Sequence, residues 1–288
     1  MLALRKQFEQ QGIKVTHKIK HGTAACLFNS FNFDFGYLRR KANRNIRLVH
    51  RVDGPTSLVR GTDREWDDKV FDVYNRLAEV TVFQSAWSLA QARELGYKPV
   101  NPVIIPNAAD PEIFNRRDKP PFSENRKIRL ISTCWSDNVR KGYPVYKWLD
   151  EHLDWNRFEY TFVGRVPGNF DNIRLIPPQP SEKLADILRQ HDIYIIASRN
   201  EPCSNALIEA LACGLPALYL NSGSHSELVK SGGLGFDRPE EIPARLDELA
   251  QNYQTFQDRI SAPDIKGVAD RYLALLTQPE ADNEYLTY

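Results

Sequence analysis

The sequence has few cysteines, no long apolar run and almost no net charge. Its four cysteines, Cys26, Cys134, Cys203 and Cys213, form no CxxC pair with a matching His or Cys cluster. Neither a structural zinc site nor a disulfide framework is therefore expected, and a reducing compartment fits best. No segment approaches the roughly 20 apolar residues that span a bilayer. The first residues also lack the apolar core of a signal peptide, so we predict a cytoplasmic protein.

The balance of charged residues and the lack of certain motifs exclude other classes of protein. Lys and Arg number 38 and Asp and Glu 37, which gives a net charge of +1, and no basic run stands out. We therefore expect no nucleic-acid partner. No GxGxxG follows a predicted strand, which argues against a dinucleotide-dependent dehydrogenase. No carboxylate pair in a loop suits a divalent ion, because Asp67 and Asp68 lie in a helical pattern where neighbours point apart. We predict neither a metal nor a cofactor.

Short apolar runs alternate with helical patterns, which predicts βαβ units and parallel sheets in an α/β protein. A polar, proline-bearing stretch, Arg116–Arg126, is the predicted linker. The predicted parts are residues 1–120, residues 121–262, and a C-terminal helix and tail at 263–288 that packs back toward the first domain. The predicted strands are Ile13–His17, Ala25–Ser30, Ile46–Arg51, Val80–Ser85, Val103–Pro106, Ile128–Cys134, Tyr160–Val163, Ile173–Ile176, Ile193–Ala197 and Ala217–Leu220. The predicted helices include the N-terminal segment ending at Gly12, Trp66–Ala78, Ala86–Leu95, Val145–His152, Ser181–Gln190, Asn205–Cys213 and Asp264–Leu276.

The most informative run is Ile193–Asn221, a strand followed by a polar loop and a short helix. Ser204 is placed to cap the helix, and Gly214 and Pro216 end it. The start of a helix offers unpaired amides and the positive end of its dipole, which suits a phosphate. The expected phosphate-binding amides are those of Asn205, Ala206 and Leu207.

Two carboxylates flank this helix start. Glu201 lies in the loop before it and Glu209 in its second turn. Two like charges beside a diphosphate suit hydroxyl groups rather than the phosphates, and a nucleotide sugar carries hydroxyls at both ends of its diphosphate. The alternative is an ordinary crossover in which Glu209 is a surface charge. The accompanying Pro202, Ser204 and Gly214 favour the binding site.

The run from Glu201 to Pro216 resembles the Glu-x7-Glu motif of glycosyltransferase family 4, whose members have the GT-B fold. That fold has two Rossmann-like, doubly wound domains facing a central cleft. Four other segments support the resemblance, which covers nearly the whole chain: Ile104–Phe114, Ile128–Gly142, Phe162–Pro167 and Ser231–Phe236. The resemblance implies an acceptor-side first domain and a donor-binding second domain.

The resemblance also implies roles for single residues. Glu201 contacts hydroxyls of the transferred sugar, and Glu209 contacts those of the ribose. Lys141, next to Arg140, is similar to the lysine that neutralises the leaving phosphate. For Arg140 and Lys141 the alternative is a solvent-exposed basic turn. Charge builds on the diphosphate as the anomeric bond breaks, so fixed cations and amides there stabilise the transition state.

The implied reaction is transfer of a hexosyl group with retention and without a metal, from a nucleotide-diphosphate sugar to a glycan, lipid-linked or other hydroxyl acceptor. The resemblance further implies a role in polysaccharide or lipid-linked glycan synthesis and peripheral contact with the inner face of a membrane. The alternative is a catalytically impaired GT-B protein that binds a nucleotide or sugar, or serves as a partner subunit. Release of nucleoside diphosphate from a sugar donor separates the two.

Three features of the sequence either depart from the family pattern or fit it in more than one way. Either His50 or Asp53, in the run Ile46–Pro55, fills the place of a functional histidine at this strand end in the family; the alternatives are a structural histidine and a turn-forming Asp-Gly-Pro. Ser136 stands where many members carry an arginine. The chain also begins inside what resembles the first helix, without the usual strand and Gly-rich loop, through a misassigned start, a shortened chain or a true loss.

Overall fold

The structure is a computed structural model that describes residues 2–30 and 34–277. It contains two compact units. The first consists of the residues up to Asn107 together with those from Asp264 on, and the second runs from Ala108 to Pro263. The sequence placed the first boundary later, at residue 120. The difference arises because Ala109, Ile113 and Phe114 pack into the apolar core of the second unit.

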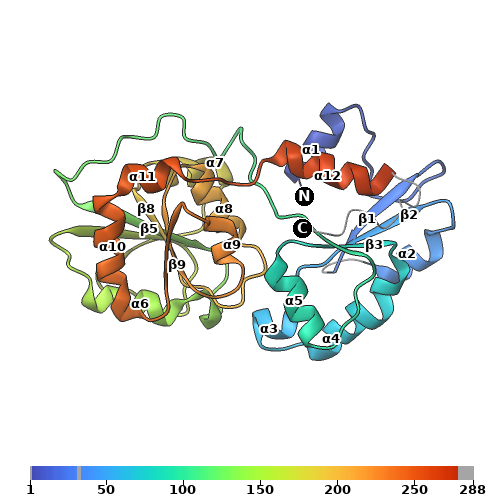
Figure 1. Cartoon of the computed structure of the whole chain (residues 1–288), viewed down its shortest axis with the longest axis horizontal. Helices are drawn as coiled ribbons and strands as arrows, with labels where there is room; N and C mark the ends of the chain where they lie inside the picture. Colours follow the sequence, from blue (N-terminus) through green and yellow to red (C-terminus); the bar gives the residue numbers. More distant parts are fainter. Residues whose placement is uncertain (1, 31–33, 278–288) are drawn as a thin grey trace. The chain divides into compact units, whose positions relative to one another are not determined.

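The first unit is a parallel sheet with helices on it. Its strands are β1 (Ala25–Asn29), β2 (Arg47–Arg51), β3 (Val80–Phe83) and β4 (Pro102–Ile104), and they lie side by side in sequence order. One group of helices comprises α1 (Leu2–Gln10) and α12 (Ile265–Thr277), which contact each other, with α12 also on β1 and β2 (Figure 1). The other helices are α2 (Phe35–Lys41), α3 (Thr56–Arg60), α4 (Arg64–Asp68) and α5 (Ala86–Glu94).

Two predicted elements of this unit differ in the structure. The segment 13–17 is not a strand; it is irregular, and its alternating residues bury no face. The predicted helix Trp66–Ala78 is a helical run of three kinds: α4, a π-helical segment at Lys69–Tyr74 and a 3₁₀ turn at Asn75–Leu77. Strands predicted at 25–30, 46–51 and 80–85 are present with slightly shorter bounds.

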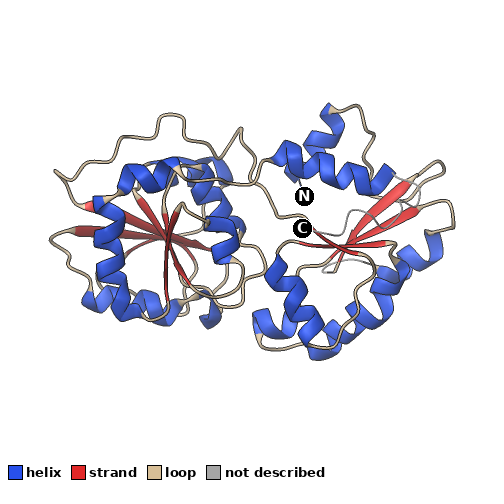
Figure 2. Ribbon diagram, in the orientation of Figure 1, coloured by secondary structure: helices blue, strands red, loops and turns tan. Residues whose placement is uncertain are grey.

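The second unit is a six-stranded parallel sheet with helices on both faces (Figure 2). The strand order is β10-β9-β8-β5-β6-β7, which is the doubly wound order of dinucleotide-binding domains. Separate apolar clusters cover its two faces. The strands are β5 (Ile128–Cys134), β6 (Phe158–Gly164), β7 (Arg174–Ile176), β8 (Ile193–Ile196), β9 (Ala217–Leu220) and β10 (Gly233–Phe236). The helices are α6 (Tyr143–His152), α7 (Ser181–Arg189), α8 (Asn205–Ala212), α9 (His225–Val229), α10 (Ile242–Gln251) and α11 (Tyr253–Asp258).

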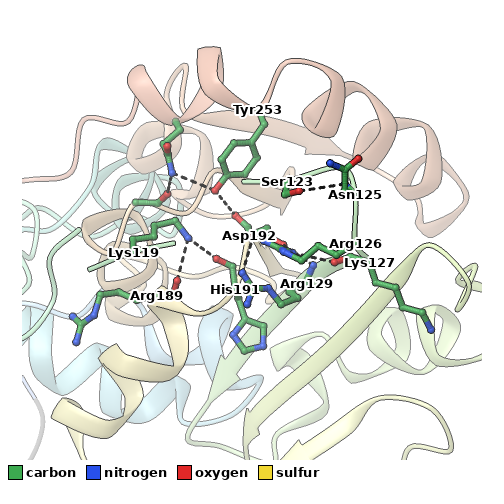
Figure 3. A network of polar contacts seen from close by, with 12 residues as sticks. Lys119, Ser123, Asn125, Arg126, Lys127, Arg129, Arg189, His191, Asp192 and Tyr253 are labelled. Atoms are coloured by element: carbon green, nitrogen blue, oxygen red, sulfur yellow. Dashed lines mark hydrogen bonds and ion pairs between the residues drawn. The ribbon is translucent and has the colours of Figure 1, made fainter. Parts of the chain in front are cut away.

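The predicted linker at 116–126 belongs to the second unit and is tied to it by polar contacts (Figure 3). Arg126 makes two hydrogen bonds of 2.6 and 2.8 Å to the buried carboxylate of Asp192, which also accepts from the amide of Arg129 at 2.8 Å. These contacts hold the pKa of Asp192 below its ordinary value despite burial. Lys119 donates to the carbonyl of His191 just beyond α7. The predicted linker is therefore fixed against the sheet of the second unit.

Candidate functional site

The polar residues of interest in the second unit lie at the point where the strand order reverses. Strands β5 and β8 are neighbours, yet their connections run in opposite directions across the sheet. The loop after β5 carries Lys141, and the loop after β8 carries Glu201 and Ser204. In open parallel sheets, ligands bind at the carboxyl ends of the strands at this reversal. The topology thus brings together residues that are about 60 positions apart in the sequence.

Helix α8 begins and ends as its sequence predicts. The hydroxyl of Ser204 accepts a hydrogen bond from the amide of Leu207 at 3.3 Å, so Ser204 is the N-cap. Gly214 follows the helix with φ of 81°, and the amide of Leu215 reaches back to the carbonyl of Ala210, which forms a Schellman motif. The cap corrects one expectation. Because Ser204 already accepts from Leu207, that amide is not available to a phosphate.

The first hydrogen bond within α8 runs from the amide of Ile208 to the carbonyl of Ser204, so the amides before it are those of Asn205, Ala206 and Leu207. Asn205 is exposed and Ala206 is half-buried, so solvent reaches this end of the helix. A helix of this kind places partial positive charge at its start, which favours an anion there.

Lys141 and Glu201 form an ion pair beside this helix start. The ammonium of Lys141 donates to Oε2 of Glu201 at 2.6 Å. Both side chains are largely shielded from water, with 31% and 15% of their surfaces exposed. Partial burial strengthens such a pair relative to a surface one. The structure thus brings together two of the predicted site residues, one from each loop.

Close backbone packing fixes the loop that carries Lys141. Gly142 has φ of 97°, and a Cβ atom there would come within 2.7 Å of the backbone of Ala197 at the end of β8. The amide of Arg199 donates to the carbonyl of Arg140 at 2.9 Å. Arg140 itself is exposed. The two loops therefore touch through their backbones, and only glycine fits at position 142.

A buried histidine supports the loop of Glu201, and the sequence did not reveal it. Nδ1 of His225 lies 2.9 Å from the carbonyl of Leu220, and Nε2 lies 3.2 Å from the hydroxyl of Ser198. Burial lowers the pKa of His225, so the neutral ring donates to Leu220 and accepts from Ser198. The amide of Ser224 donates to the carbonyl of Glu201 at 2.9 Å. The only sequence signal was the small, polar run at 221–224 after β9.

Glu209 lies one and a half turns into α8 and is half-buried. Burial raises the pKa of its carboxyl to about 7. A carboxyl in this state is poised between its neutral and charged forms near neutral pH. Groups with such shifted pKa values are often found at functional sites.

In the first unit, His50 and Asp53 have very different surroundings. His50 is fully buried: its ring stacks on Phe28 with centroids 4.4 Å apart, and Asn75 and Ser30 face its two nitrogens at 3.0 and 3.3 Å. Burial lowers its pKa to about 3. Asp53 is 40% exposed. The structure therefore corrects the expectation for His50, which cannot reach a substrate through the residues that cover it, and leaves Asp53 as the candidate.

Within residues 2–30 and 34–277, no three His, Cys, Asp or Glu side chains gather in a way that could hold a metal ion. The helices of this part of the chain are all too short or too polar to cross a membrane.

Sequence comparison finds the similarity to a known family in the second unit. Residues 168–262 match the family model for glycosyl transferases group 1, a segment that includes Glu201, Ser204 and Glu209. A D-inositol 3-phosphate glycosyltransferase from Rhodococcus erythropolis is 35% identical over 91 residues, which cover 30% of this chain and 21% of that protein. The GPI3 subunit of phosphatidylinositol N-acetylglucosaminyltransferase from Saccharomyces cerevisiae is 30% identical over 149 residues, 44% of this chain and 32% of that protein. The matched regions span 21% and 32% of the length of these two curated relatives.

Solved structures extend the similarity to most of the chain. Sucrose-phosphate synthase from Thermosynechococcus elongatus superposes with a TM-score of 0.65 at 15% identity, over 89% of this chain and 70% of that one. The Anabaena protein HepE in complex with UDP-glucose gives a TM-score of 0.61 at 14% identity, over 80% of this chain and 72% of that one. The fold is therefore GT-B, with two Rossmann-like α/β units. The segment 168–262 is similar to glycosyl transferases group 1, and the solved structures share the fold.

Proposed function

We propose that this chain is a retaining, metal-independent glycosyltransferase of family 4 that holds a nucleotide-diphosphate sugar on its second unit. The observation that carries the proposal is the Lys141–Glu201 pair beside the start of α8. A cation, a carboxylate that can accept from hydroxyls and the positive end of a helix dipole thus lie within two adjacent loops. A nucleotide sugar needs this combination, because its diphosphate is flanked by hydroxyl-bearing rings.

Each residue has a role in this proposal. Lys141 and the amides of Asn205 and Ala206 receive the diphosphate, with Arg140 as a further cation. Glu201 accepts hydrogen bonds from the transferred sugar. Glu209 accepts them from the ribose. Because negative charge grows on the leaving phosphate as the anomeric bond breaks, these cations and amides lower the barrier to transfer.

The acceptor hydroxyl attacks on the face from which the nucleotide leaves, so the configuration of the anomeric carbon is retained. The departing phosphate takes the proton of that hydroxyl. No nucleophile from the protein is required, and Asp53 of the first unit helps to place the acceptor. Acceptors of this kind are glycans, lipid-linked sugars or other polyols. Cytoplasmic location, with peripheral contact to the inner membrane face, belongs to the same proposal.

The first experiment is a thermal-shift screen of nucleoside diphosphates and nucleotide sugars, since a ligand that binds only the native state raises its stability. Uridine nucleotides come first, because a similar structure was solved with UDP-glucose. The nucleotide that binds is then tested as its sugar conjugate for release of nucleoside diphosphate, with and without EDTA. The anomer of the product is read by NMR.

Donor release that is unaffected by EDTA, with a product of unchanged anomeric configuration, is the expected result. An inverted product would contradict retention, and loss of activity in EDTA would contradict independence from metal. Binding of a nucleotide sugar without any release would favour the alternative of an impaired, nucleotide-binding protein.

A further inference from the structure

Arg51 organises the polar end of the first sheet. It is the last residue of β2, and its guanidinium donates to Oδ1 of Asn29 at 2.9 Å, Oδ1 of Asp53 at 2.5 Å and Oδ1 of Asn107 at 2.9 Å. Asn29 ends β1 and lies opposite Arg51 in the strand register. Only 12% of the Arg51 side chain is exposed, whereas Asp53 is 40% exposed. The cation is thus an internal support, and the groups around it form the surface.

Arg51 is neutralised by its own neighbours. A carboxylate at 2.5 Å offsets its charge, and three of its five N–H groups already have oxygen partners. An arginine that recognises phosphate instead keeps its planar fork open for two parallel hydrogen bonds. A phosphate here would also lie beside Asp53 and be repelled. This end of the sheet therefore does not provide an arginine site for an anion.

The helix that follows β2 is neutralised in the same way. At the start of α3, the amides of Thr56 and Ser57 donate to the carboxylate of Asp67 at 2.6 and 2.9 Å, and the hydroxyl of Ser57 does so at 2.6 Å. Asp67 is buried, with 1% of its surface exposed. The donors that might attract an anion beside Arg51 are thus occupied by a carboxylate of the same unit.

We infer that the first unit binds an uncharged, hydroxyl-rich group, such as an unphosphorylated sugar or polyol, at the cluster formed by Asn29, Arg51, Asp53 and Asn107. This inference rests on the proposed function, in which the first unit receives the acceptor. Asp53 accepts hydrogen bonds from hydroxyls. Asn29 turns its oxygen toward Arg51, so its NH₂ group faces away from Arg51 and suits a hydroxyl oxygen. Arg51 is a positioning residue that fixes all three.

The test compares matched pairs of ligands that differ only by a phosphate: methyl glucoside with glucose 6-phosphate, and myo-inositol with inositol 3-phosphate. Binding to the full chain is measured by saturation-transfer NMR titration at low and high salt. UDP is present in excess, so that the proposed donor site cannot take the phosphorylated ligands. Binding of UDP itself is scored separately by thermal shift.

The variants are Arg51→Gln, Arg51→Lys and Asp53→Asn, with Arg47→Gln as the matched control. Arg47 lies at the other end of β2 and likewise pairs with a carboxylate, Glu79, at 3.0 Å. Both Arg→Gln changes should lower the melting temperature similarly. Only Arg51→Gln should weaken binding of the uncharged ligand, by at least fivefold, and Arg51→Lys should recover part of it. Asp53→Asn should also weaken it.

The expected result is that the uncharged member of at least one pair binds, with an affinity that salt does not change. Tighter, salt-sensitive binding of the phosphorylated member would overturn the inference. So would equal effects of Arg51→Gln and Arg47→Gln, or no binding of any ligand. If UDP fails to bind while an uncharged ligand binds at this cluster, the donor assignment fails and the inference about this cluster stands.

Discussion

The second unit brings Lys141 and Glu201 together from two different loops, whereas in the first unit Arg51 ends β2 and Asp53 lies two residues further on. In the second unit the strand order reverses between β5 and β8, so two loops meet beside the start of α8. In the first unit the described strands follow one another in sequence order, and a carboxylate accepts hydrogen bonds at the start of α3. Both units pair a cation with a carboxylate, and they differ in the ligand proposed for the surface beside that pair: an anion in the second unit and an uncharged group in the first.

Replacing Lys141 by methionine should break this contrast most severely. The change removes the cation that faces the leaving phosphate and leaves Glu201 partly buried without its partner. Turnover of the nucleotide sugar should fall by about 10²-fold or more, with a smaller effect on binding. Steady-state kinetics of nucleotide release measure this. Lys127→Met is the control, because Lys127 lies just before the opposite end of β5, where its ammonium donates to the carbonyl of Trp155 at 2.7 Å. Equal losses in both variants would contradict the assignment.

Acidity should weaken the donor affinity of the second unit. Glu209 has a pKa of about 7, and in the proposed function the hydroxyls of the ribose donate to its charged form. The ionised fraction therefore rises about tenfold between pH 6 and pH 8, and the affinity for a nucleotide sugar should rise with it. Isothermal titration of wild type and Glu209→Gln measures this, and the variant should bind weakly at both values. A flat profile for the wild type would argue against contact with Glu209.

The same carboxyl predicts the opposite trend in stability. The pKa of Glu209 is higher in the folded chain than its ordinary value of 4.5. The folded state therefore binds more protons, and this contribution to stability is present below pH 4.5 and is lost as the pH rises to about 7. Without ligand, the melting temperature of Glu209→Gln should therefore rise relative to that of the wild type as the pH increases from 4.5 to about 7. A stability difference that does not change with pH would contradict the shifted pKa.

Acid should destabilise the first unit through His50. Its pKa is about 3 in the folded chain and about 6.5 when exposed, so the unfolded chain binds the proton more readily. Its stabilising contribution is complete above pH 6.5 and is lost as the pH falls toward 3, by up to about 1.4 kcal/mol per pH unit. Urea unfolding at pH 7, 6 and 5 should show a shallower dependence for His50→Gln. An unchanged slope would contradict a buried, neutral His50.

The smallest expected effect compares two matched helix caps. Ser204 caps α8 in the second unit, and Ser85 caps α5 in the first by accepting from the amide of Ser88 at 3.1 Å. Either Ser→Ala change should lower the free energy of unfolding by about 1 kcal/mol. Only Ser204→Ala should also weaken nucleotide binding, because it loosens the amides that face the diphosphate. Loss of binding in the Ser85→Ala variant as well would remove the distinction between the units.

The sequence predicted the elements whose signals are local. The start and end of α8 followed from Ser204 and Gly214, because capping is decided within a few residues. The strand predicted at 13–17 is absent, although its residues alternate, because a strand also needs a neighbour and a buried face. Strand β10 was not predicted, because Gly233 and Gly235 have low strand propensity. A Cβ at Gly233 would approach the carbonyl of Ala217 to 1.9 Å, so glycine is needed there.

The candidate site was predictable in its parts but not in its pairings. The residue types around Lys141, Glu201 and Glu209 indicated their chemistry. The contact of Lys141 with Glu201, and the hydrogen bond from the amide of Ser224 to the carbonyl of Glu201, depend on which strands are neighbours in the sheet. The burial of His50 likewise depends on Phe28 and Asn75, which lie more than 20 residues before and after it in the sequence. Local patterns contain no information of this kind.

The boundaries of the units affect how the chain is made. The second unit is one continuous segment, from Ala108 to Pro263, inserted into the first. During translation, the second unit emerges in full before α12, which packs on β1 and β2. Part of the apolar face of the nascent first sheet therefore stays uncovered until α12 leaves the ribosome. A stop codon just before Asp264 should accordingly leave a well-formed second unit attached to an aggregation-prone first half.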